Sequence, residues 1–400
     1  MQLKGLNNLR VREFNKKVLM TLLYREKTAS KSTLARLSNL SIPAVGKILN
    51  DLQQEGRVVH SEVNLHSRGL GGGSYQVAVE DSDILCMNVS PYRIESILVD
   101  RLITAKSEFR VSEISVQTPN ELLNEIERLF HDYRKQYRGR NLSLALSVHG
   151  QVNPTTGVSQ NMPQAPWDST IEIKYLLEEK LNTEILMDND CIMLALAEKW
   201  QHTEIQHDFC VINVDYGIGS SFVINQQIYR GNLFGSGQIG HTIIDPDGSL
   251  CSCGRYGCLE TIASLSAMKK KARMLLKNGS AAADKSALRT PTTQEIIEGY
   301  HQGDENLRVM VFSAARALGL SLYNFLNILN INQIYLYGRS CGFGEAWLST
   351  VLEQSGLNPF DKTDSVKTQA THIGLGTLSR EQQIMGIGYL YVEQALENRV

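Results

Sequence analysis

The chain has 400 residues, of which 42% are hydrophobic and 20% are charged, and only nine are prolines. This composition excludes disordered and collagen-like proteins, and the length predicts two or three domains. Seven cysteines, three of them in one short loop, argue against a secreted disulfide framework. The N-terminus has no apolar signal core and no run approaches the length of a membrane span, so we expect a cytoplasmic protein without membrane insertion.

The net charge of −2 hides an asymmetry between the two ends of the chain. Residues 1–80 carry 12 lysines and arginines against 6 acidic residues, whereas the other 320 residues carry 28 against 36. A basic end on an acidic body is typical of a nucleic-acid-binding module joined to another domain.

The basic segment predicts three helices. The run Val11–Tyr24 places apolar side chains, including Phe14, on one helical face. Ser30 stands at the N-cap of a second, short helix, and Ser41 at the N-cap of a third. Asn39 occupies the turn between these two, where asparagine tolerates the left-handed backbone conformation. Two short helices joined by a tight turn predict a helix-turn-helix.

Two alternating runs after the third helix, Arg57–Val63 and Ser74–Val79, predict strands, with a basic, glycine-rich tip at 64–73. This pattern indicates a winged helix-turn-helix, and a three-helix protein-interaction module is the alternative. Because the third helix offers few hydrogen-bonding side chains, we expect DNA specificity to depend on apolar contacts, the wing and DNA shape more than on bidentate base contacts. The residues predicted to contact DNA are Lys31, Ser41, Ala44, Lys47 and Arg68, with Asn50 beside them on the third helix.

A loop at 240–261 combines one histidine with three cysteines. An imidazole and three sulfurs suit tetrahedral Zn²⁺, and four protein ligands leave no position for a metal-bound water, so the zinc would be structural. Gly254 and Gly257 allow a sharp turn between the last two cysteines. A redox pair at Cys251 and Cys253, or unconnected thiols, is the alternative. The predicted zinc ligands are His241, Cys251, Cys253 and Cys258.

Beyond residue 80, strand-like and helical runs alternate, which predicts a mixed α/β body without an internal repeat. The strand-like runs are Ile84–Val99, Leu142–Val148, Phe209–Val214 and Ile334–Tyr337, and helical runs include Asn120–Tyr137, Cys191–Trp200 and Asn306–Leu329.

The histidine–cysteine loop, the pair Asn189-Asp190, the turn Gly217-Ile-Gly219 and the run 320–338 together resemble the ROK family. This family groups bacterial sugar kinases with sugar-responsive repressors, and the resemblance covers essentially the whole chain. The N-terminal winged helix-turn-helix makes it similar to the repressor branch.

The resemblance implies an α/β fold with an actin-like, hexokinase-like body of two lobes behind the DNA-binding domain of residues 1–80. The first lobe would comprise residues 81–190, rejoined by a C-terminal helix at 380–400. The second lobe, residues 191–379, would hold the zinc loop and the oligomerisation surface.

The resemblance also implies a sugar site. His241 would place one ring nitrogen on zinc and offer the other to a sugar hydroxyl. Asp190 and Glu260 each have a purely structural alternative, as the N-cap of a helix and as a carboxylate at a helix N-terminus. The kinases carry a carboxylate where this chain has Gln238, which predicts a ligand other than glucose or a lower affinity. The implied sugar-binding residues are Gly150, Gln151, Asn161, Asn189, Asp190, Gln238, His241 and Glu260.

The family's kinases bind ATP phosphates with a glycine-rich loop of the type Asp-x-Gly-Gly-Thr-Lys. The matching stretch here is 88–94, where Pro91 has no N–H, Tyr92 fills space and Asn88 replaces the acidic residue. Phosphoryl transfer depends on positioning and charge stabilisation, so we expect no catalytic residues and no enzymatic activity. Asp190, the general base of the kinases, would have no phosphate donor.

These observations predict a homo-oligomeric transcriptional regulator, a homodimer or homotetramer, that represses carbohydrate-utilisation genes. Its partners would be a double-stranded DNA operator and a sugar or sugar-phosphate effector. A regulator controlled by a protein, such as a sugar-transport component, and an ATP-dependent sugar kinase that carries a DNA-binding domain are the alternatives.

Overall fold

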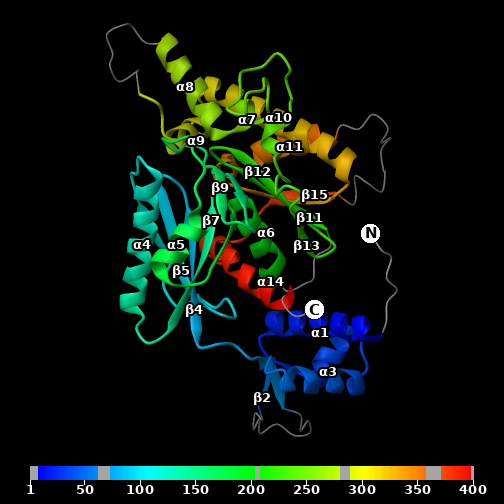
Figure 1. Ribbon diagram of the computed structural model, residues 1–400. Coiled ribbons are helices and arrows are strands. Elements are labelled where there is room, and N and C mark those ends of the chain that lie inside the picture. Colours follow the sequence, from blue (N-terminus) through cyan, green and yellow to red (C-terminus); the bar gives the residue numbers. More distant parts are fainter. Residues whose placement is uncertain (1–7, 62–72, 203–207, 280–288, 357–370, 398–400) are drawn as a thin grey trace. The chain divides into compact units, whose positions relative to one another are not determined.

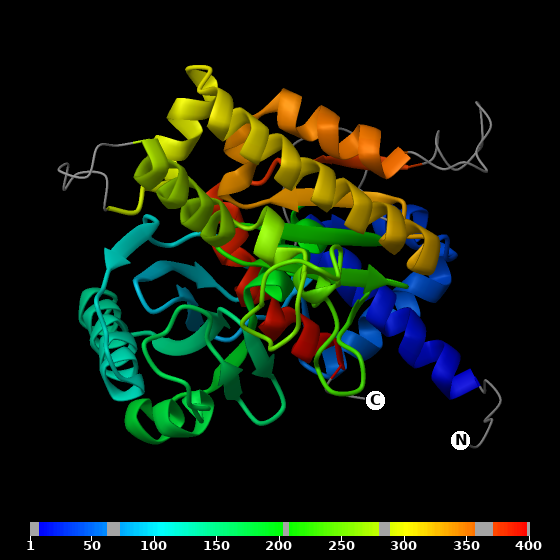
Figure 2. The same cartoon turned by 90° about the horizontal axis from the view of Figure 1, so that it is seen from above.

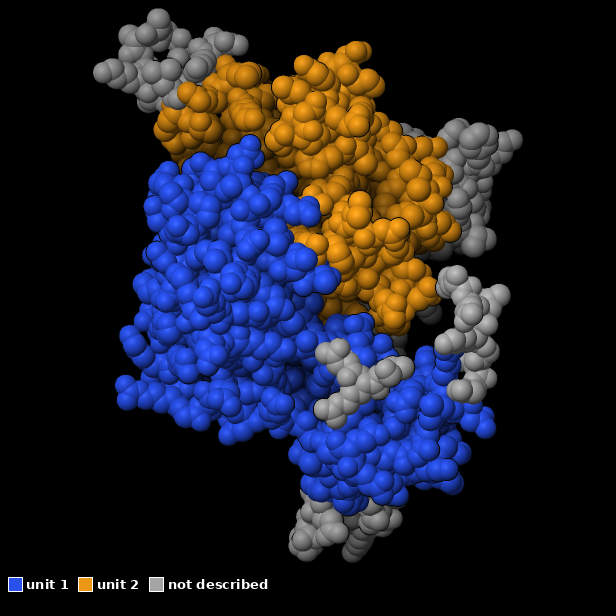
Figure 3. Space-filling view, viewed as in Figure 1, with its two compact units in different colours: residues 1–149, 154–188, 380–400 blue, residues 150–153, 189–379 orange. Residues whose placement is uncertain are grey.

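The computed structural model describes residues 8–61, 73–202, 208–279, 289–356 and 371–397. The chain divides into two compact units, which are coloured separately in Figure 3. Unit 1 comprises residues 1–149, 154–188 and 380–400, and unit 2 comprises residues 150–153 and 189–379.

Unit 1 begins with three helices and a small antiparallel sheet (Figure 1). The predicted caps are confirmed, because the Ser30 side chain accepts a hydrogen bond from the Thr33 N–H and Ser41 accepts one from the Ala44 N–H. Asn39 has the predicted left-handed conformation, with φ 56° and ψ 29°. The elements are α1 (Asn8–Glu26), α2 (Lys31–Ser38), α3 (Ile42–Gln54), β1 (Ala29–Ser30), β2 (Val58–Ser61) and β3 (Ser74–Val77), with sheet order β1-β3-β2.

Phe14 lies on the predicted first helix, but its side chain is 66% exposed. Burial on α1 starts only at Lys16, whose ammonium group pairs with Glu55 at 2.6 Å and ties α1 to the end of α3. Residues 64–72 of the predicted wing tip, including Arg68, lie outside the described residues.

The N-terminal segment (residues 8–61 and 73–80) packs on the rest of unit 1 through the last helix, α14 (Tyr389–Glu397). Helix α1 contacts α14, and the Arg57 guanidinium donates to the Ala395 carbonyl at 3.2 Å. The Lys27 ammonium donates to the Leu102 carbonyl. The two ends of the chain therefore meet within one compact unit.

The body of unit 1 is built on a five-stranded sheet of order β10-β7-β4-β5-β6. Strand β4 pairs parallel to β7 and antiparallel to β5, and every residue of β4 is buried. The strands are β4 (Ser82–Val89), β5 (Arg93–Asp100), β6 (Arg110–Glu113), β7 (Asn141–Val148) and β10 (Ile185–Asn189), with β9 (Val158–Asn161) outside the sheet. The helices are α4 (Pro119–Gln136), α5 (Ile173–Leu181), α13 (Arg380–Met385), the 3₁₀ turn η4 (Gly386–Gly388) and α14.

Unit 2 contains a second five-stranded sheet, of order β13-β12-β11-β14-β15. Helices α10 and α11 lie side by side over it (Figure 2), and α6 packs on β11 and β12. The strands of this sheet are β11 (Phe209–Val214), β12 (Ile218–Ile224), β13 (Gln227–Tyr229), β14 (Gln333–Tyr337) and β15 (His372–Leu375), with β8 (Gln151–Asn153) outside the sheet. The helices are α6 (Asp190–Gln201), η1 (Ile239–His241), α7 (Glu260–Ala263), α8 (Leu265–Gly279), α9 (Thr293–His301), α10 (Glu305–Leu329), η3 (Arg339–Phe343) and α11 (Glu345–Gly356).

Helix α10 corrects the expectation that no run reaches the length of a membrane span. Its mean hydropathy over 18 residues is 1.4. Among the described residues, this is the one helix that is long enough and apolar enough to cross a bilayer. Its side chains Val311, Leu318 and Leu322 are nevertheless completely buried in the core of unit 2. We therefore assign it as a core helix, which is apolar because its neighbours cover it.

A buried polar network in unit 1 ties α13 to the central sheet. The Glu95 carboxylate accepts hydrogen bonds from Arg380 Nε at 2.9 Å and from the Asn88 amide at 3.0 Å. Asn88 in turn accepts from the Ser147 hydroxyl at 2.8 Å and is 3% exposed. Burial by itself would raise the pKa of Glu95, but the hydrogen bonds and charge of Arg380 outweigh it and hold this pKa below its usual value.

Replacing Arg380 by alanine leaves the Glu95 carboxylate buried without its cation. We expect Arg380→Ala to lower the free energy of unfolding at pH 7 by about 2 kcal/mol, below the ~3–5 kcal/mol of a fully buried pair. The expected loss is smaller because the arginine side chain is 44% exposed, so that solvent screens its charge. Urea denaturation at pH 7 and pH 4 measures the difference.

The pH dependence identifies the cause of that loss. Because the folded pKa of Glu95 is depressed, the pair stabilises the protein above the ordinary carboxyl pKa of about 4.3, and this contribution disappears as the pH falls. In the variant, protonation at pH 4 removes the unpaired charge, so the two proteins should differ less there. Arg128→Ala, which removes exposed ion pairs on α4, is the control and should cost no more than about 0.5 kcal/mol. An equal loss at both pH values would contradict the assignment.

Candidate functional site

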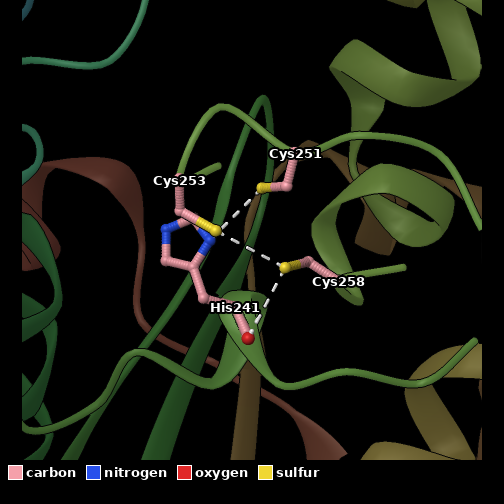
Figure 4. Close-up of side chains that lie close together, drawn as sticks. All are labelled: His241, Cys251, Cys253 and Cys258. Carbon is pink, nitrogen blue, oxygen red and sulfur yellow. Dashed lines mark hydrogen bonds between the residues drawn. The ribbon is translucent and has the colours of Figure 1, made fainter. Parts of the chain in front are cut away.

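The predicted histidine and three cysteines form one cluster in unit 2 (Figure 4). One donor atom from each of the four residues lies within 4.8 Å of the others. Cys253 Sγ is 3.6 Å from Cys258 Sγ, and Cys251 Sγ is 3.5 Å from His241 Nδ1. A metal with bonds of roughly 2.3 Å to sulfur in tetrahedral geometry separates its sulfur ligands by roughly 3.8 Å. The cluster therefore has the donor set and the spacing of a closed metal site.

Glycine at position 257 is required by the fold of the loop. A Cβ atom on Gly257 would lie 1.4 Å from the Asp245 carbonyl oxygen, and its φ of +70° favours glycine. The Gly257 N–H donates to the Ser249 carbonyl at 2.9 Å, and its own carbonyl accepts from the Ile244 N–H at 2.8 Å. These contacts bring Cys258 back beside His241. The sequence predicted this proximity, because it assigned both residues to one metal site.

The thiols differ in their readiness to ionise. A hydrogen bond from the Arg255 backbone lowers the pKa of Cys253, whereas burial and the neighbouring thiols raise the pKa of Cys258 to about 12. Metal binding must therefore displace protons, so affinity for a metal falls as the pH falls.

Several of the predicted sugar-binding residues surround the start of β12. Glu260, the first residue of α7, accepts a hydrogen bond from the Ile218 N–H at 3.1 Å. A Cβ on Gly217 would lie 2.8 Å from Glu260 Oε2, and one on Gly219 would lie 2.6 Å from Cys191 Sγ. Glycine at both positions allows the strand to approach α6 and α7 closely.

Asp190 is the first residue of α6, next to Cys191, and it contacts strand β11. The Asn213 amide donates to Asp190 Oδ2 at 3.2 Å. The structural alternative for Asp190, helix N-cap, is wrong. Asn189 is the N-cap and its side chain accepts from the Ile192 N–H at 2.8 Å. Because β10 runs directly into α6, the cap is the last residue of the strand, and Asp190 is left without a capping role.

The segment that carries Gln238 and His241 lies along the other side of β12. The Ser220 N–H donates to the Gly237 carbonyl at 2.9 Å, and a Cβ on Gly240 would lie 2.2 Å from the Ile218 carbonyl oxygen. Gln238 is exposed and His241 is partly buried. Asp190, Gln238, His241 and Glu260 therefore all project from elements that contact the same short strand.

The other predicted sugar-binding residues lie on segments other than those around the start of β12. Gly150, with φ +95°, and Gln151 at the start of β8 belong to unit 2, where a Cβ on Gly235 would lie 3.7 Å from the Gln151 amide nitrogen. Asn161 ends β9 in unit 1 and is exposed.

Sequence reasoning missed an ion pair beside the Gly217 turn. Arg339 donates to both oxygens of Asp215, and its guanidinium carbon lies 4.3 Å from the ring centroid of Tyr216. Lys269 donates to the Tyr216 hydroxyl at 2.6 Å. Burial would raise the pKa of Tyr216, but the hydrogen bond and charge of Lys269, with Arg339, lower it. No local pattern signals this cluster, because Asp215 and Arg339 are 124 residues apart.

The described residues predicted to contact DNA lie on α2 and α3. Lys31 begins α2, and Ser41 caps α3. Lys47 and Asn50 are exposed on α3, and Ala44 is partly exposed in its first turn.

Comparison with known proteins agrees with this architecture. The model described as "ROK family" matches residues 85–354. The uncharacterized protein YphH of Escherichia coli (strain K12) is 56% identical over 393 residues, 98% of each chain. The xylose repressor of Caldicellulosiruptor bescii is 24% identical over 357 residues, 87% of this chain and 88% of the repressor.

Two solved structures define the fold. A ROK family transcriptional regulator, homolog of the E. coli MLC protein, superimposes with a TM-score of 0.76 at 21% identity and covers 96% of each chain. The ROK hexokinase of Thermus thermophilus gives a TM-score of 0.62 at 21% identity, over 78% of this chain and 99% of the hexokinase. Homologous regulators and sugar kinases thus share one body of actin-like, hexokinase-like fold. This chain belongs to the ROK family.

Proposed function

We propose that the protein is a sugar-responsive transcriptional repressor of carbohydrate-utilisation genes, which acts in the cytoplasm as a homo-oligomer. The N-terminal segment carries this proposal. The hexokinase matches 78% of this chain, whereas the regulator matches 96%, so the regulator's fold accounts for the additional segment.

In this proposal the N-terminal segment is a winged helix-turn-helix. Helices α2 and α3 are joined by the turn at Asn39 and Leu40, and the strands β2 and β3 supply the base of a wing. The exposed cations Lys31 and Lys47 suit contacts with phosphate, and the net charge of residues 1–80 is positive. Such modules bind as dimers whose half-site spacing the protein sets, so repression requires an oligomer.

The loop at 88–94 supports the loss of kinase activity. Asn88 is 3% exposed and both ends of its amide are hydrogen-bonded inside the protein, so it presents no group to a nucleotide. The Ser90 hydroxyl closes the turn by donating to the Arg93 carbonyl at 3.0 Å, and the Tyr92 hydroxyl donates to the Gln164 carbonyl. This turn is a closed hairpin, unlike an open cradle of backbone N–H groups.

The residues around the start of β12 would bind the sugar. Asp190 and Glu260 supply carboxylate acceptors, and Gln238 supplies an amide that both donates and accepts. Sugar hydroxyls need such paired groups on rigid supports, and the two carboxylates are held by the Asn213 amide and the Ile218 N–H.

The Cys3His cluster would hold a structural Zn²⁺. His241 Nδ1 faces Cys251 Sγ, which leaves Nε2 for a sugar hydroxyl. The zinc would supply no catalysis, because four protein ligands close its coordination sphere. Its role would be to fix the position of His241 relative to that of Glu260, which follows the ligand Cys258 by two residues.

The first prediction concerns the metal. Cys253→Ser removes one of four ligands, so we expect zinc affinity to fall more than ~100-fold, beyond the roughly 10–100-fold cost of losing a supporting hydrogen bond. Zinc content after dialysis, measured by mass spectrometry, checks it. Cys341→Ser, at a partly buried thiol outside the cluster, is the control and should keep its zinc. A Cys253→Ser protein with full zinc content would show that the cluster is not the site.

The second prediction concerns the sugar. Duplexes captured from genomic DNA are titrated with hexoses, amino sugars and their phosphates, and release is followed by fluorescence anisotropy. One sugar should release the wild-type protein, and Asp190→Asn should need roughly 10–100-fold more of it, because a hydrogen bond to a charged group is lost. Asp132→Asn, at a half-exposed side chain of α4, should respond as wild type. If no sugar releases the wild type, control by a protein partner replaces this proposal.

The third prediction concerns DNA. Lys47→Ala should weaken binding to all DNA sequences about equally. It should also reduce the slope of log affinity against log salt concentration by about 1, because one phosphate contact is lost. Lys180→Ala makes the same charge change on α5 and should leave binding unchanged. Affinities of the three proteins across a salt series test this, and a Lys47→Ala protein with wild-type affinity at every salt concentration would exclude the predicted docking of α3.

A further inference from the structure

Gly46 occupies an unexpected position in the middle of α3. Glycine is the least favourable residue other than proline in a helix interior, because it loses the most backbone entropy on folding. A Cβ at this position would meet no atom within 4 Å, and Gly46 is not among the residues with positive φ. Neither packing nor backbone conformation therefore requires glycine here. The remaining physical reason for a glycine is the close approach of another molecule to the backbone.

Gly46 is partly exposed, and its neighbours on the outward side of the helix are exposed. Residues four apart share a helical face, so Ile42 and Asn50 lie on either side of Gly46. Ile42 is 54% exposed, although it is a large apolar residue, and Lys47 and Asn50 are exposed. The opposite face holds the buried residues of α3, which are Val45, Ile48, Leu49 and Leu52. The outward face of α3 therefore combines one apolar side chain, a bare stretch of backbone, one amide and one ammonium group.

This combination fits the major-groove edge of A·T base pairs. The C5 methyl of thymine is the apolar group on base edges in the major groove, and an asparagine amide pairs bidentately with adenine. Residues near the N-terminus of a recognition helix are those that reach base edges, and Ile42 is the first residue of α3. A helix without a side chain at position 46 can lie closer to these edges than one with it.

We infer that Gly46 is a specificity determinant that lets α3 lie against A·T pairs, with Ile42 on a thymine methyl and Asn50 toward an adenine. The inference rests on the proposed DNA-binding function and deepens it. It assigns roles to Gly46 and Ile42, and it makes direct contact with bases a larger part of recognition than the few polar side chains of α3 suggest.

The first test separates folding from binding. Full-length wild-type protein selects duplexes from a random pool, and the selected duplex then serves as the probe for all variants. Gly46→Ala should bind it roughly tenfold or more weakly, because the added methyl moves the helix away from the bases. The same variant should melt at the wild-type temperature or higher, because alanine is the better helix former. Gly356→Ala, at a helical glycine of α11 whose Cβ would also meet no atom within 4 Å, should bind as wild type.

The second test leaves the protein's backbone unchanged. Replacing each thymine of the selected duplex by deoxyuridine removes only the methyl group. At one position per half-site the wild-type affinity should fall roughly fourfold, the effect of exposing one buried methyl group. Ile42→Ala should bind more weakly than wild type and should not distinguish thymine from uracil at that position.

The outcomes distinguish the inference from the proposal beneath it. A wild-type protein that selects no sequence from the pool would overturn the DNA-binding function itself. A wild-type protein that selects a duplex, together with a Gly46→Ala variant of equal affinity and no effect of uracil, would overturn only the inference. A Gly46→Ala variant that melts at a lower temperature and loses binding would also overturn it, because the glycine would then serve the fold.

Discussion

Three thiols and one imidazole lie together in a loop that has only a small core. Between His241 and Glu260 the larger apolar side chains Ile243, Leu250 and Tyr256 are exposed. Leu259 is buried in the core of unit 2, Ile244 packs against this core, and backbone hydrogen bonds such as those of Gly257 join the two arms of the loop. The cluster joins His241 at one end of the loop to Cys258 at the other, and Glu260 follows two residues later. In the proposed function, metal ligation would offset the entropy that is lost when the ends of this loop meet. The geometry around β12 would then depend on this cluster together with the burial of Leu259.

Each unit also contains a carboxylate that is held by an arginine from a distant part of the sequence. Glu95 pairs with Arg380 in unit 1, and Asp215 pairs with Arg339 in unit 2. In both pairs burial acts to raise the carboxyl pKa, but the hydrogen bonds and charge of the arginine lower it by more. Both carboxyl groups therefore stay ionised and paired with their arginine. A carboxylate that is already paired with an arginine is not available to a metal–nucleotide complex, and this supports the proposal that the body binds a ligand without phosphorylating it.

The sequence was informative where the chemistry is local. The caps at Ser30 and Ser41 and the left-handed Asn39 follow from side chains within three residues, and the metal cluster lies within 18 residues. Partners that meet only in the folded protein left no such signal. Arg380 lies 285 residues from Glu95, and Glu55 lies 39 residues from its partner Lys16 on α1. The apolar character of α10 was underestimated for a similar reason, because only burial in the tertiary core explains so apolar a helix.

The packing of α1 on α14 has a consequence for how the protein is made. Helix α1 is synthesised before α14, and more than 350 residues separate the two. At ribosomal rates of about 5–20 residues per second, the surface of α1 that faces α14 stays uncovered for tens of seconds. Unit 2 is synthesised entirely within this interval, because it lies between the two parts of unit 1. Helix α1 therefore reaches its contacts with α14 only after unit 2 has been synthesised, and a nascent chain interrupted anywhere before α14 lacks these contacts.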